Sequence, residues 1–285
     1  MPGPQQRRRM AAEPLRLGKV AYLNCEPVYA GLADGSTPAR CTIVEGTPAA
    51  LNDALMAGRL EVSVISSLAY ARARGALRLL PNLAIACDGP VVSVRCFSRV
   101  PWGNLTGRRV LLAAASLTAA CLLRVLLHRR FGVEPEYVPA ADGEGLPADV
   151  DAGLLIGDPA LREAGRERFP YDLDLGEEWK AWTGLPFVFA VWAVREDVWR
   201  ERAEDVRALH RALSASKAYG LARAEAISQA VHARVGMTEE ACLAYFRKHL
   251  SFDLSPRHLE GLRAFFALPE VRAQVGQSVP LRFIN

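Results

Sequence analysis

The feature that most constrains the fold of this 285-residue chain is the alternation of short apolar segments with amphipathic ones. The apolar segments have the length and composition of buried strands. They span residues 17–23, 60–65, 83–87, 91–97, 110–115, 153–156 and 185–194. The amphipathic segments include predicted helices over 47–58 and 117–130, and from residue 196 onwards the pattern is helical only, in four segments. This alternation predicts an α/β protein with a mostly parallel sheet and C-terminal helices.

The first predicted helix has clear start and stop signals. Thr47 is followed by proline, which gives a capping hydroxyl and a proline at the first helical position. Gly58 is a typical helix end. Between them we expect Leu51, Leu55 and Met56 to form the buried face.

Two long apolar strands, over 91–97 and 185–194, flank a middle segment of strands and helices. One explanation is that they are two crossings between lobes, although periodicity alone equally allows one continuous sheet. The first explanation divides the chain into two lobes. In this division residues 1–14 are a loose tail, 15–93 with 192–285 form the first lobe, and 94–191 form the second.

Charge and apolar content argue against several classes of function. The chain carries 35 Lys and Arg against 31 Asp and Glu, a net charge of +4, and three of the positive charges are consecutive arginines near the N-terminus. The nearly neutral remainder argues against a nucleic-acid partner. No apolar stretch reaches the ~18 to 20 residues of a membrane helix. The arginine-rich start is not followed by the apolar region of a secretory signal.

Cysteine and histidine usage argues against metal sites and disulfides. The six cysteines have no CxxC pairing and mostly lie in apolar runs, which is typical of reduced, buried thiols in a cytoplasmic protein. The five histidines lie in predicted helices without metal-ligand spacing, so we expect them at the surface. The nucleotide-binding pattern GxGxxG does not occur. We expect no metal and no cofactor, and the sequence does not predict an oligomeric state.

Polar residues gather where the predicted strands end. They are Asn24, Ser66, Ser67, Ser93, Ser116, Thr118, Gly157 and Asp158. In open α/β sheets, ligands bind beyond the carboxyl ends of the strands and against helix N-termini. All of these residues except Asp158 are uncharged. The set suits a small organic anion held by hydroxyls and backbone N–H groups.

Each of these residues also has a purely structural interpretation. Ser116, like the serine pair at 66–67, can be a plain helix N-cap. Asn24 precedes Pro27 and can be a turn residue that bonds nearby backbone. Asp158 can cap the helix that follows it. From position alone, these interpretations remain open beside the binding one.

Several segments of the chain match, in order, the motifs of one known family. They are residues 20–27 (VAYLNCEP), 87–94 (CDGPVVSV), 155–161 (LIGDPAL), 174–179 (DLGEEW) and 182–190 (WTGLPFVFA). In these segments the chain resembles the chorismate dehydratase family of menaquinone biosynthesis, in the futalosine pathway. The matches fall within residues 17–194. The C-terminal helices resemble the family only in being helical and of similar length.

The resemblance implies a two-lobe, type II periplasmic-binding-protein-like fold with the ligand cleft between the lobes. It implies dehydration of chorismate to 3-[(1-carboxyvinyl)oxy]benzoate without metal or organic cofactor. The family's opening asparagine falls on Asn24, its hinge serine on Ser93, and its Gly-Asp pair on residues 157–158. Its anion loop, typically SRTS, falls on residues 116–119. There Leu117 replaces the usual arginine and an alanine replaces the second serine, while the first serine and the threonine are kept.

The proton acceptor of such a reaction is open between two candidates. Asp158 is the only acidic residue among the strand-end candidates, and the substrate's own enolpyruvyl carboxylate is the alternative. We favour the substrate's carboxylate, because a second carboxylate beside a dianionic ligand is electrostatically unfavourable. Asn24 is expected to hydrogen-bond the reacting region, with Ser116 and Thr118 holding a carboxylate.

Three other functions compete with this one. A non-catalytic binding protein for a small carboxylate is the first, and the lack of an export signal disfavours it. A ligand-sensing module of a transcription regulator is the second, and the short segment before residue 17 is too small for a helix-turn-helix. The third is the related dihydroxynaphthoate synthase, whose opening motif differs from YLN.

Overall fold

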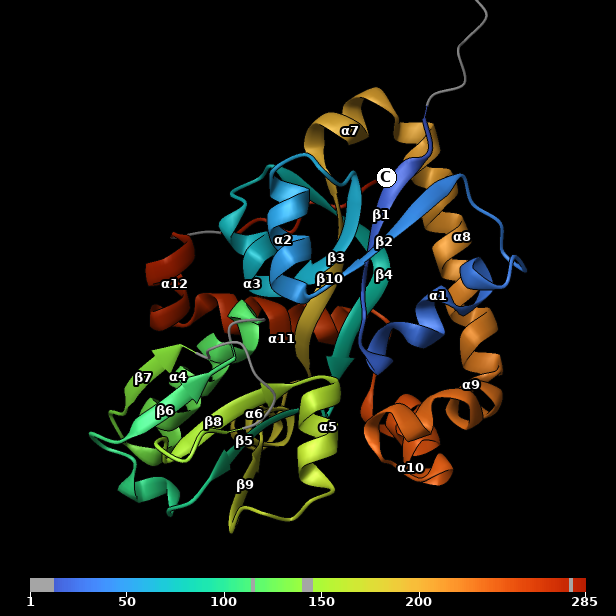
Figure 1. Cartoon of the computed structure of the whole chain (residues 1–285). Helices are drawn as coiled ribbons and strands as arrows, with labels where there is room; N and C mark the ends of the chain where they lie inside the picture. The colour runs from blue at the N-terminus through green and yellow to red at the C-terminus, as the bar shows by residue number, and fades with distance from the viewer. Residues whose placement is uncertain (1–12, 114–115, 140–145, 277–278) are drawn as a thin grey trace, which may run out of the picture.

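The computed structural model describes residues 13–113, 116–139, 146–276 and 279–285. They form two lobes, each built on a five-stranded sheet (Figure 1). The strand order in the first sheet is β2-β1-β3-β10-β4. Its strands are β1 (Leu15–Val20), β2 (Cys41–Gly46), β3 (Val62–Ser66), β4 (Leu77–Cys87) and β10 (Phe187–Arg195).

The second sheet has the order β7-β6-β8-β5-β9. Its strands are β5 (Val94–Ser98), β6 (Arg109–Leu112), β7 (Glu136–Pro139), β8 (Ala152–Ile156) and β9 (Tyr171–Asp174). In each sheet two strand pairings are parallel and two are antiparallel. The prediction of a mostly parallel sheet is therefore wrong. β5 and β10, which follow the two crossings between the lobes, each run antiparallel to both of their neighbours.

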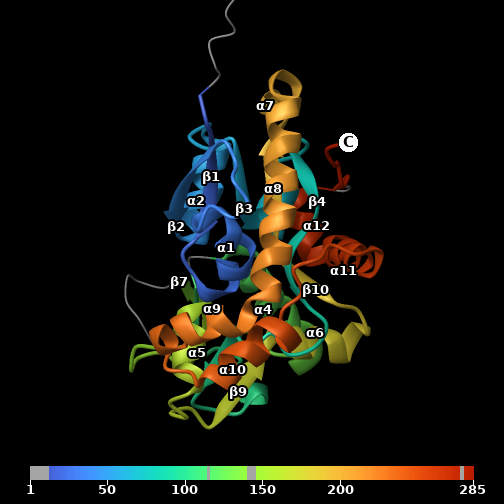
Figure 2. The same cartoon turned by 90° about the vertical axis from the view of Figure 1, so that its right-hand side faces the viewer.

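Helices cover both sheets. Those of the first 183 residues are α1 (Glu26–Ala33), α2 (Pro48–Met56), α3 (Ser67–Arg72), α4 (Leu117–Phe131), α5 (Asp158–Ala164) and α6 (Leu175–Thr183). The C-terminal ones are α7 (Glu196–Glu201), α8 (Ala203–Ala222), α9 (Ala224–Val231), α10 (Glu239–Ala244), α11 (Pro256–Ala267) and α12 (Pro269–Val275). Figure 2 shows the long α8 lying along the first lobe beside α1, where Ser216 of α8 accepts hydrogen bonds from the N–H groups of Gly31 and Leu32.

The start and stop signals of α2 act as predicted, but one residue of its predicted buried face is exposed. The Thr47 side chain accepts a hydrogen bond from the N–H of Ala50. Leu51 and Leu55 are buried, whereas Met56 is 51% exposed. Residues four apart share a helix face, and the next residue lies about 100° further round. Met56 therefore leaves the core that Leu55 enters.

Two short crossings join the lobes, over residues 88–93 and 184–186. The Asp174 carboxylate fixes the first crossing, because it accepts hydrogen bonds from the N–H groups of Val91 (3.0 Å) and Val92 (2.7 Å). Val92 has φ 54°, a conformation that costs a β-branched residue free energy and persists only where neighbours hold it. All of β10 pairs within the first sheet, so residues 187–191, assigned to the second lobe in the predicted division, lie with β3 and β4.

Most predicted strands and helices are present, with shifted ends. The segment 83–87 is the second half of β4, which begins at Leu77, and the predicted strand 91–97 begins three residues late, as β5. β2, β7 and β9 were not predicted. Each lies at the edge of a sheet and carries exposed polar residues, so none has a continuous apolar run.

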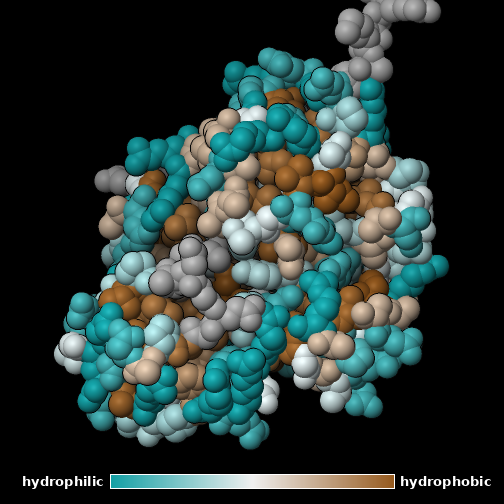
Figure 3. All heavy atoms as spheres, viewed as in Figure 1, coloured by the Kyte–Doolittle hydropathy of each residue, from teal (hydrophilic) through white to brown (hydrophobic). Residues whose placement is uncertain are grey.

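The predicted burial of the cysteines is confirmed, whereas one histidine that was predicted to be exposed is buried. All six cysteines are free and five are buried, as expected. His258 is buried rather than exposed, because its ring completes a capping box with Ser255 at the start of α11. Both lobes present a largely hydrophilic face in Figure 3, interrupted by hydrophobic side chains over β1 and β2, where Val44 is exposed. No helix in the described part of the chain is long and apolar enough to cross a membrane.

Candidate functional site

A cavity of about 60 Å³ lies between the two lobes. The first lobe lines it with the segment after β1, the end of β3 and part of β10, and the second lobe with the starts of β5 and α4 and the end of β8. Its walls are mostly aliphatic, with the Phe189 ring on one side. Four polar side chains reach it, those of Tyr22, Asn24, Ser66 and Ser116.

Asn24 carries the least satisfied polar atom of the cavity. It sits in a 3-10 turn (Leu23–Cys25) directly after β1. Its side-chain Oδ1 is buried and has no hydrogen-bond partner among the described residues. A buried acceptor without a donor costs about 1–3 kcal/mol. The turn therefore holds an acceptor in the cavity wall that is suited to a hydrogen-bond donor on a bound molecule.

Ser66 and Ser116 cap helices and also line the cavity. The Ser66 hydroxyl oxygen accepts from the N–H of Ala69 (3.2 Å), and the Ser116 oxygen accepts from the N–H of Ala119 (3.2 Å). Each hydroxyl still has its own hydrogen to donate. The capping and binding interpretations are therefore compatible for both residues. The α4 N-terminus beside Ser116 adds a positive dipole end at the same wall.

Ser67 and Thr118 do not line this cavity. Both are fully buried, and their hydroxyl oxygens lie 3.2 Å apart. Thr118 also accepts a hydrogen bond from the N–H of Leu68 (2.9 Å). These contacts join the start of α3 in the first lobe to the start of α4 in the second. The structure thus places the two residues in a contact between lobes rather than at the cavity surface.

Ser93 and Gly157 connect the crossing to the cavity. The N–H of Gly157 donates to the Ser93 carbonyl oxygen (2.7 Å), and Ser93 itself is buried outside the cavity lining. Gly157 has φ 61°, and a Cβ there would lie 2.6 Å from Cγ of Tyr22. The Tyr22 ring of the first lobe therefore packs directly on the Gly157 backbone of the second. A side chain at residue 157 would hold the two lobes apart.

Asp158 lies next to Gly157 but outside the cavity lining. Its Oδ1 accepts a hydrogen bond from the N–H of Leu23 (2.8 Å), and its Oδ2 lies 3.5 Å from the guanidinium of Arg234. Burial raises the pKa of Asp158 above its ordinary value, and the Leu23 N–H and the arginine oppose that shift. This carboxylate joins the lobes directly beside Asn24.

A sequence profile of the family described as "Menaquinone biosynthesis" matches residues 15–270. The chain belongs to this family. A chorismate dehydratase of Thermus thermophilus is 32% identical over 268 residues, which are 88% of this chain and 94% of that protein. The resemblance to the chorismate dehydratase family is thereby confirmed.

The fold of this member of the menaquinone biosynthesis family is shared with distant solved structures. An Archaeoglobus fulgidus protein of 21% identity superposes with a TM-score of 0.74, covering 93% of this chain and 99% of the other. A second structure is the periplasmic aliphatic sulphonate binding protein SsuA of Escherichia coli, which is 15% identical and superposes with a TM-score of 0.66. The match covers 95% of this chain and 97% of SsuA. These likenesses confirm the predicted periplasmic-binding-protein-like fold.

The cavity of this family member has neutral walls and little room. None of the described residues that line it carries a charged side chain. Ligand pockets for small organic molecules commonly measure about 300 to 1,000 Å³. A cavity of about 60 Å³ is smaller than this range, so it would have to widen to hold a ring acid.

Most of the residues that line the cavity were missing from the set predicted by strand ends, among them Tyr22 and Ile156. Both lie within the segments that match the family, and Ile156 directly precedes Gly157. An aromatic or aliphatic side chain does not by itself indicate a binding site, because such side chains are common in any core. The glycine at position 157 was the available sequence signal. Its φ is positive and the Tyr22 ring lies against its backbone, and glycine tolerates both. Leu117, the departure from the family's anion loop, lines a separate groove outside the cavity.

Proposed function

We propose that the protein is a chorismate dehydratase, a hydro-lyase that removes water from chorismate and forms 3-[(1-carboxyvinyl)oxy]benzoate in the cytoplasm for menaquinone biosynthesis. The observation that carries the proposal is the Asn24 Oδ1, which has no partner in the part of the chain that the structure describes and lies in a cavity between two lobes whose described lining is uncharged. The similarity to the Thermus thermophilus chorismate dehydratase supports the choice of substrate.

Chorismate offers groups that match the cavity wall. Its C4 hydroxyl is a donor for the Asn24 oxygen, which lacks one. Its ring carboxylate is an acceptor for the free hydroxyl hydrogens of Ser66 and Ser116, beside the α4 N-terminus. Neutral donors at that carboxylate stabilise negative charge where it develops during the reaction.

In the proposed reaction the C3 proton leaves first, and its electron pair is delocalised through the ring double bond onto the ring carboxylate. The C4–O bond then breaks, the ring becomes aromatic, and the departing hydroxide takes up the abstracted proton as water. The step is redox-neutral and needs no electron acceptor. Because aromatisation makes it strongly downhill, positioning and charge stabilisation supply the catalysis.

We assign the role of base to the substrate's enolpyruvyl carboxylate. The alternative base, Asp158, is held by the N–H of Leu23 and by Arg234 and does not line the cavity. A base must come within hydrogen-bond reach of the proton it abstracts. The position of Asp158 therefore favours a role in joining the lobes over a role in proton transfer.

The test is incubation of the purified protein with chorismate, followed by ultraviolet absorption and mass spectrometry. The proposal predicts a product lighter than chorismate by one water, formed at a rate proportional to protein concentration. Saturable binding of chorismate without any such product would instead support the alternative, a non-catalytic binding protein for a small carboxylate.

A further inference from the structure

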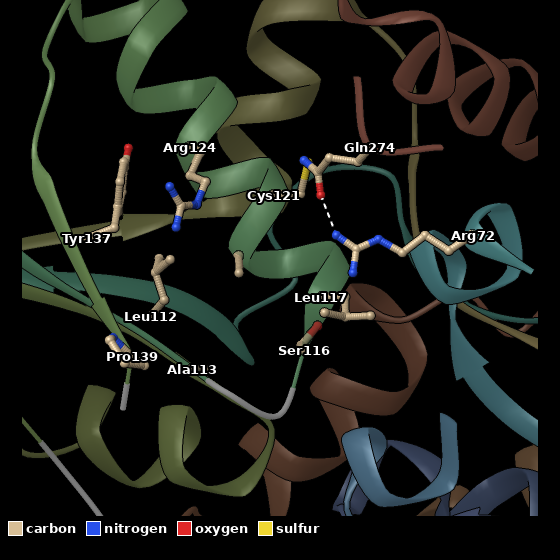
Figure 4. A pocket seen from close by; sticks show the side chains of 11 residues that line it. Arg72, Leu112, Ala113, Ser116, Leu117, Cys121, Arg124, Tyr137, Pro139 and Gln274 are labelled. Atoms are coloured by element: carbon tan, nitrogen blue, oxygen red, sulfur yellow. Dashed lines mark hydrogen bonds between the residues drawn. The ribbon is translucent and has the colours of Figure 1, made fainter. Parts of the chain in front are cut away.

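A groove of about 490 Å³ lies beside the cavity, over the outer side of α4 (Figure 4). Both lobes contribute to it. Arg72 comes from the end of α3 and Gln274 from α12, while Arg124 and Tyr137 come from α4 and β7. In Figure 4 the two guanidinium groups reach the groove from either side of α4.

The two arginines give this groove an uncompensated positive charge. Neither Arg72 nor Arg124 forms an ion pair with any residue in the described ranges. Arg72 donates instead to the neutral amide oxygen of Gln274 (2.6 Å), and the guanidinium of Arg124 stacks on the Tyr137 ring at 4.0 Å from its centroid. No acidic residue is among the described residues that line the groove. Its cations are thus held in place by neutral groups.

The amide of Gln274 is itself oriented by two further contacts. Its nitrogen donates to the Glu270 carbonyl oxygen (3.1 Å) and to the sulfur of Cys121 (3.2 Å). These contacts leave the amide oxygen directed at Arg72. The side chain of Arg72 is therefore positioned over the groove by a neutral acceptor, which does not cancel its charge.

The groove and the cavity differ in charge and share one lining residue. Ser116 lines both of them. The cavity has no cationic side chain among its described lining residues, although its proposed substrate is a dianion. Long-range attraction of a dianion to neutral donors is weak, whereas two arginines without an ion pair in the described ranges raise its local concentration in the groove that shares Ser116 with the cavity.

We infer that the Arg72–Arg124 groove is an anion-recruiting site that captures the carboxylates of the dianionic ring acid before it passes Ser116 into the cavity. This inference rests on the proposed function for the identity of the acid. It assigns the cationic part of substrate recognition to residues outside the reacting site. Because one arginine comes from each lobe, a captured carboxylate also contacts both lobes.

The test compares dehydration of chorismate by the wild-type protein and by the double variant Arg72→Gln/Arg124→Gln at about 0.02 M and about 0.3 M salt, since screening shortens the range of charge attraction. In the wild type we expect kcat/KM to fall as salt rises. At low salt the kcat/KM of the double variant should be about 10-fold lower than that of the wild type, and it should change little as salt rises. Its kcat should be unchanged. A double variant that keeps the wild-type kcat/KM and salt dependence would refute the inference.

Three further variants separate charge from packing. Arg72→Lys/Arg124→Lys keeps the charge and should keep most of the low-salt kcat/KM. Leu117→Arg adds a cation to the groove wall and should raise it. Arg211→Gln removes an exposed arginine of α8 and should match the wild type. If the lysine variant loses as much as the glutamine variant, or Arg211→Gln loses as much, recruitment by local charge is wrong.

Failure of the proposed function can be told apart from failure of this inference. If the wild type releases no water from chorismate, calorimetric titration with isophthalate, a stable ring dianion, still tests the groove at low salt. The inference then predicts that the double glutamine variant binds isophthalate on the order of 10-fold more weakly than the wild type and Arg211→Gln. Equal affinities in all three proteins would overturn it.

Discussion

The carboxylate of Asp158, at the start of α5 in the second lobe, accepts a 2.8 Å hydrogen bond from the backbone N–H of Leu23 in the first lobe. Leu23 directly precedes Asn24, whose side-chain oxygen faces the cavity. Closure of the lobes is therefore coupled to the position of the turn that carries Asn24. On this account Asp158 is a positioning residue.

Replacing Asp158 by asparagine tests that role. The amide oxygen of Asp158→Asn can still accept from the N–H of Leu23, whereas the attraction to Arg234 is lost. We predict that kcat stays within about 5-fold of the wild type and that KM rises modestly, since the hydrogen bond is kept and an ion pair to a partly exposed arginine is worth at most about 1 kcal/mol. Steady-state kinetics with chorismate measures both. Complete loss of turnover with normal substrate binding would make Asp158 the base.

The raised pKa of Asp158 predicts a pH dependence of stability. Its ordinary value is 3.8, and burial raises the folded-state pKa above it. The folded protein then holds this proton more tightly than the unfolded chain does. Above pH 3.8 the contribution of this group to the free energy of unfolding falls as pH rises, until the raised pKa is passed. Denaturant titrations of the wild type and Asp158→Asn at several pH values check this. The wild type should lose stability relative to the variant across that window, and a gain would contradict the prediction.

Two glycines with positive φ test the contact between the lobes through substrate binding: Gly184 (ψ 2°) is left-handed helical, whereas Gly157 (ψ −141°) has a conformation close to the one that only glycine adopts readily. Gly184→Ala at φ 70° meets no atom within 4 Å and should cost only the left-handed conformation, about 1–2 kcal/mol. Gly157→Ala at φ 61° should cost more stability, because its backbone conformation disfavours alanine more strongly and its Cβ would also overlap the Tyr22 ring and oppose closure. We predict a raised KM for chorismate only in Gly157→Ala. Equal KM values in the two variants would mean that Tyr22 does not meet Gly157 in the working protein.

The buried Thr118 predicts a stability effect at the contact between lobes. Thr118→Val keeps the shape but leaves the N–H of Leu68 without its acceptor. The expected loss is about 1–3 kcal/mol of unfolding free energy. Thr42→Val, at an exposed position of β2, is the matched control and should change stability by less than about 0.5 kcal/mol. Chemical denaturation measures both, and indistinguishable values would remove Thr118 from this contact.

Much of the fold was predictable because buried strands carry a strong local signal. The strands around residues 62–66 and 152–156 are fully buried, and the second of them is a continuous apolar run in the sequence. Edge strands such as β2 and β7 carry exposed polar residues, so their pairing depends on neighbours far away in the sequence. Strand direction is also non-local, which is why the mixed sheets were not foreseen.

The candidate site was predictable in part for the same reason. Strand ends predicted Asn24, Ser66 and Ser116, and the structure brings all three to one cavity, because the carboxyl ends of strands meet where lobes face each other. The same rule could not separate a hydroxyl that lines the cavity from one consumed in a buried contact, as at Thr118. That distinction depends on how the second lobe docks on the first. The groove with Arg72 also depends on docking, since its residues come from distant parts of the chain.

The most direct test of the account replaces Asn24, whose buried side-chain oxygen has no donor among the described residues. Asn24→Ala should fold normally, because it removes an unpaired buried oxygen rather than a hydrogen bond. Its kcat for chorismate dehydration should fall by about 100- to 1,000-fold, as expected for loss of a group that contacts the reacting atoms. The control Asn104→Ala, at an exposed position, should keep wild-type kcat. Turnover by Asn24→Ala within a few-fold of wild type would show that the reaction does not take place against this oxygen.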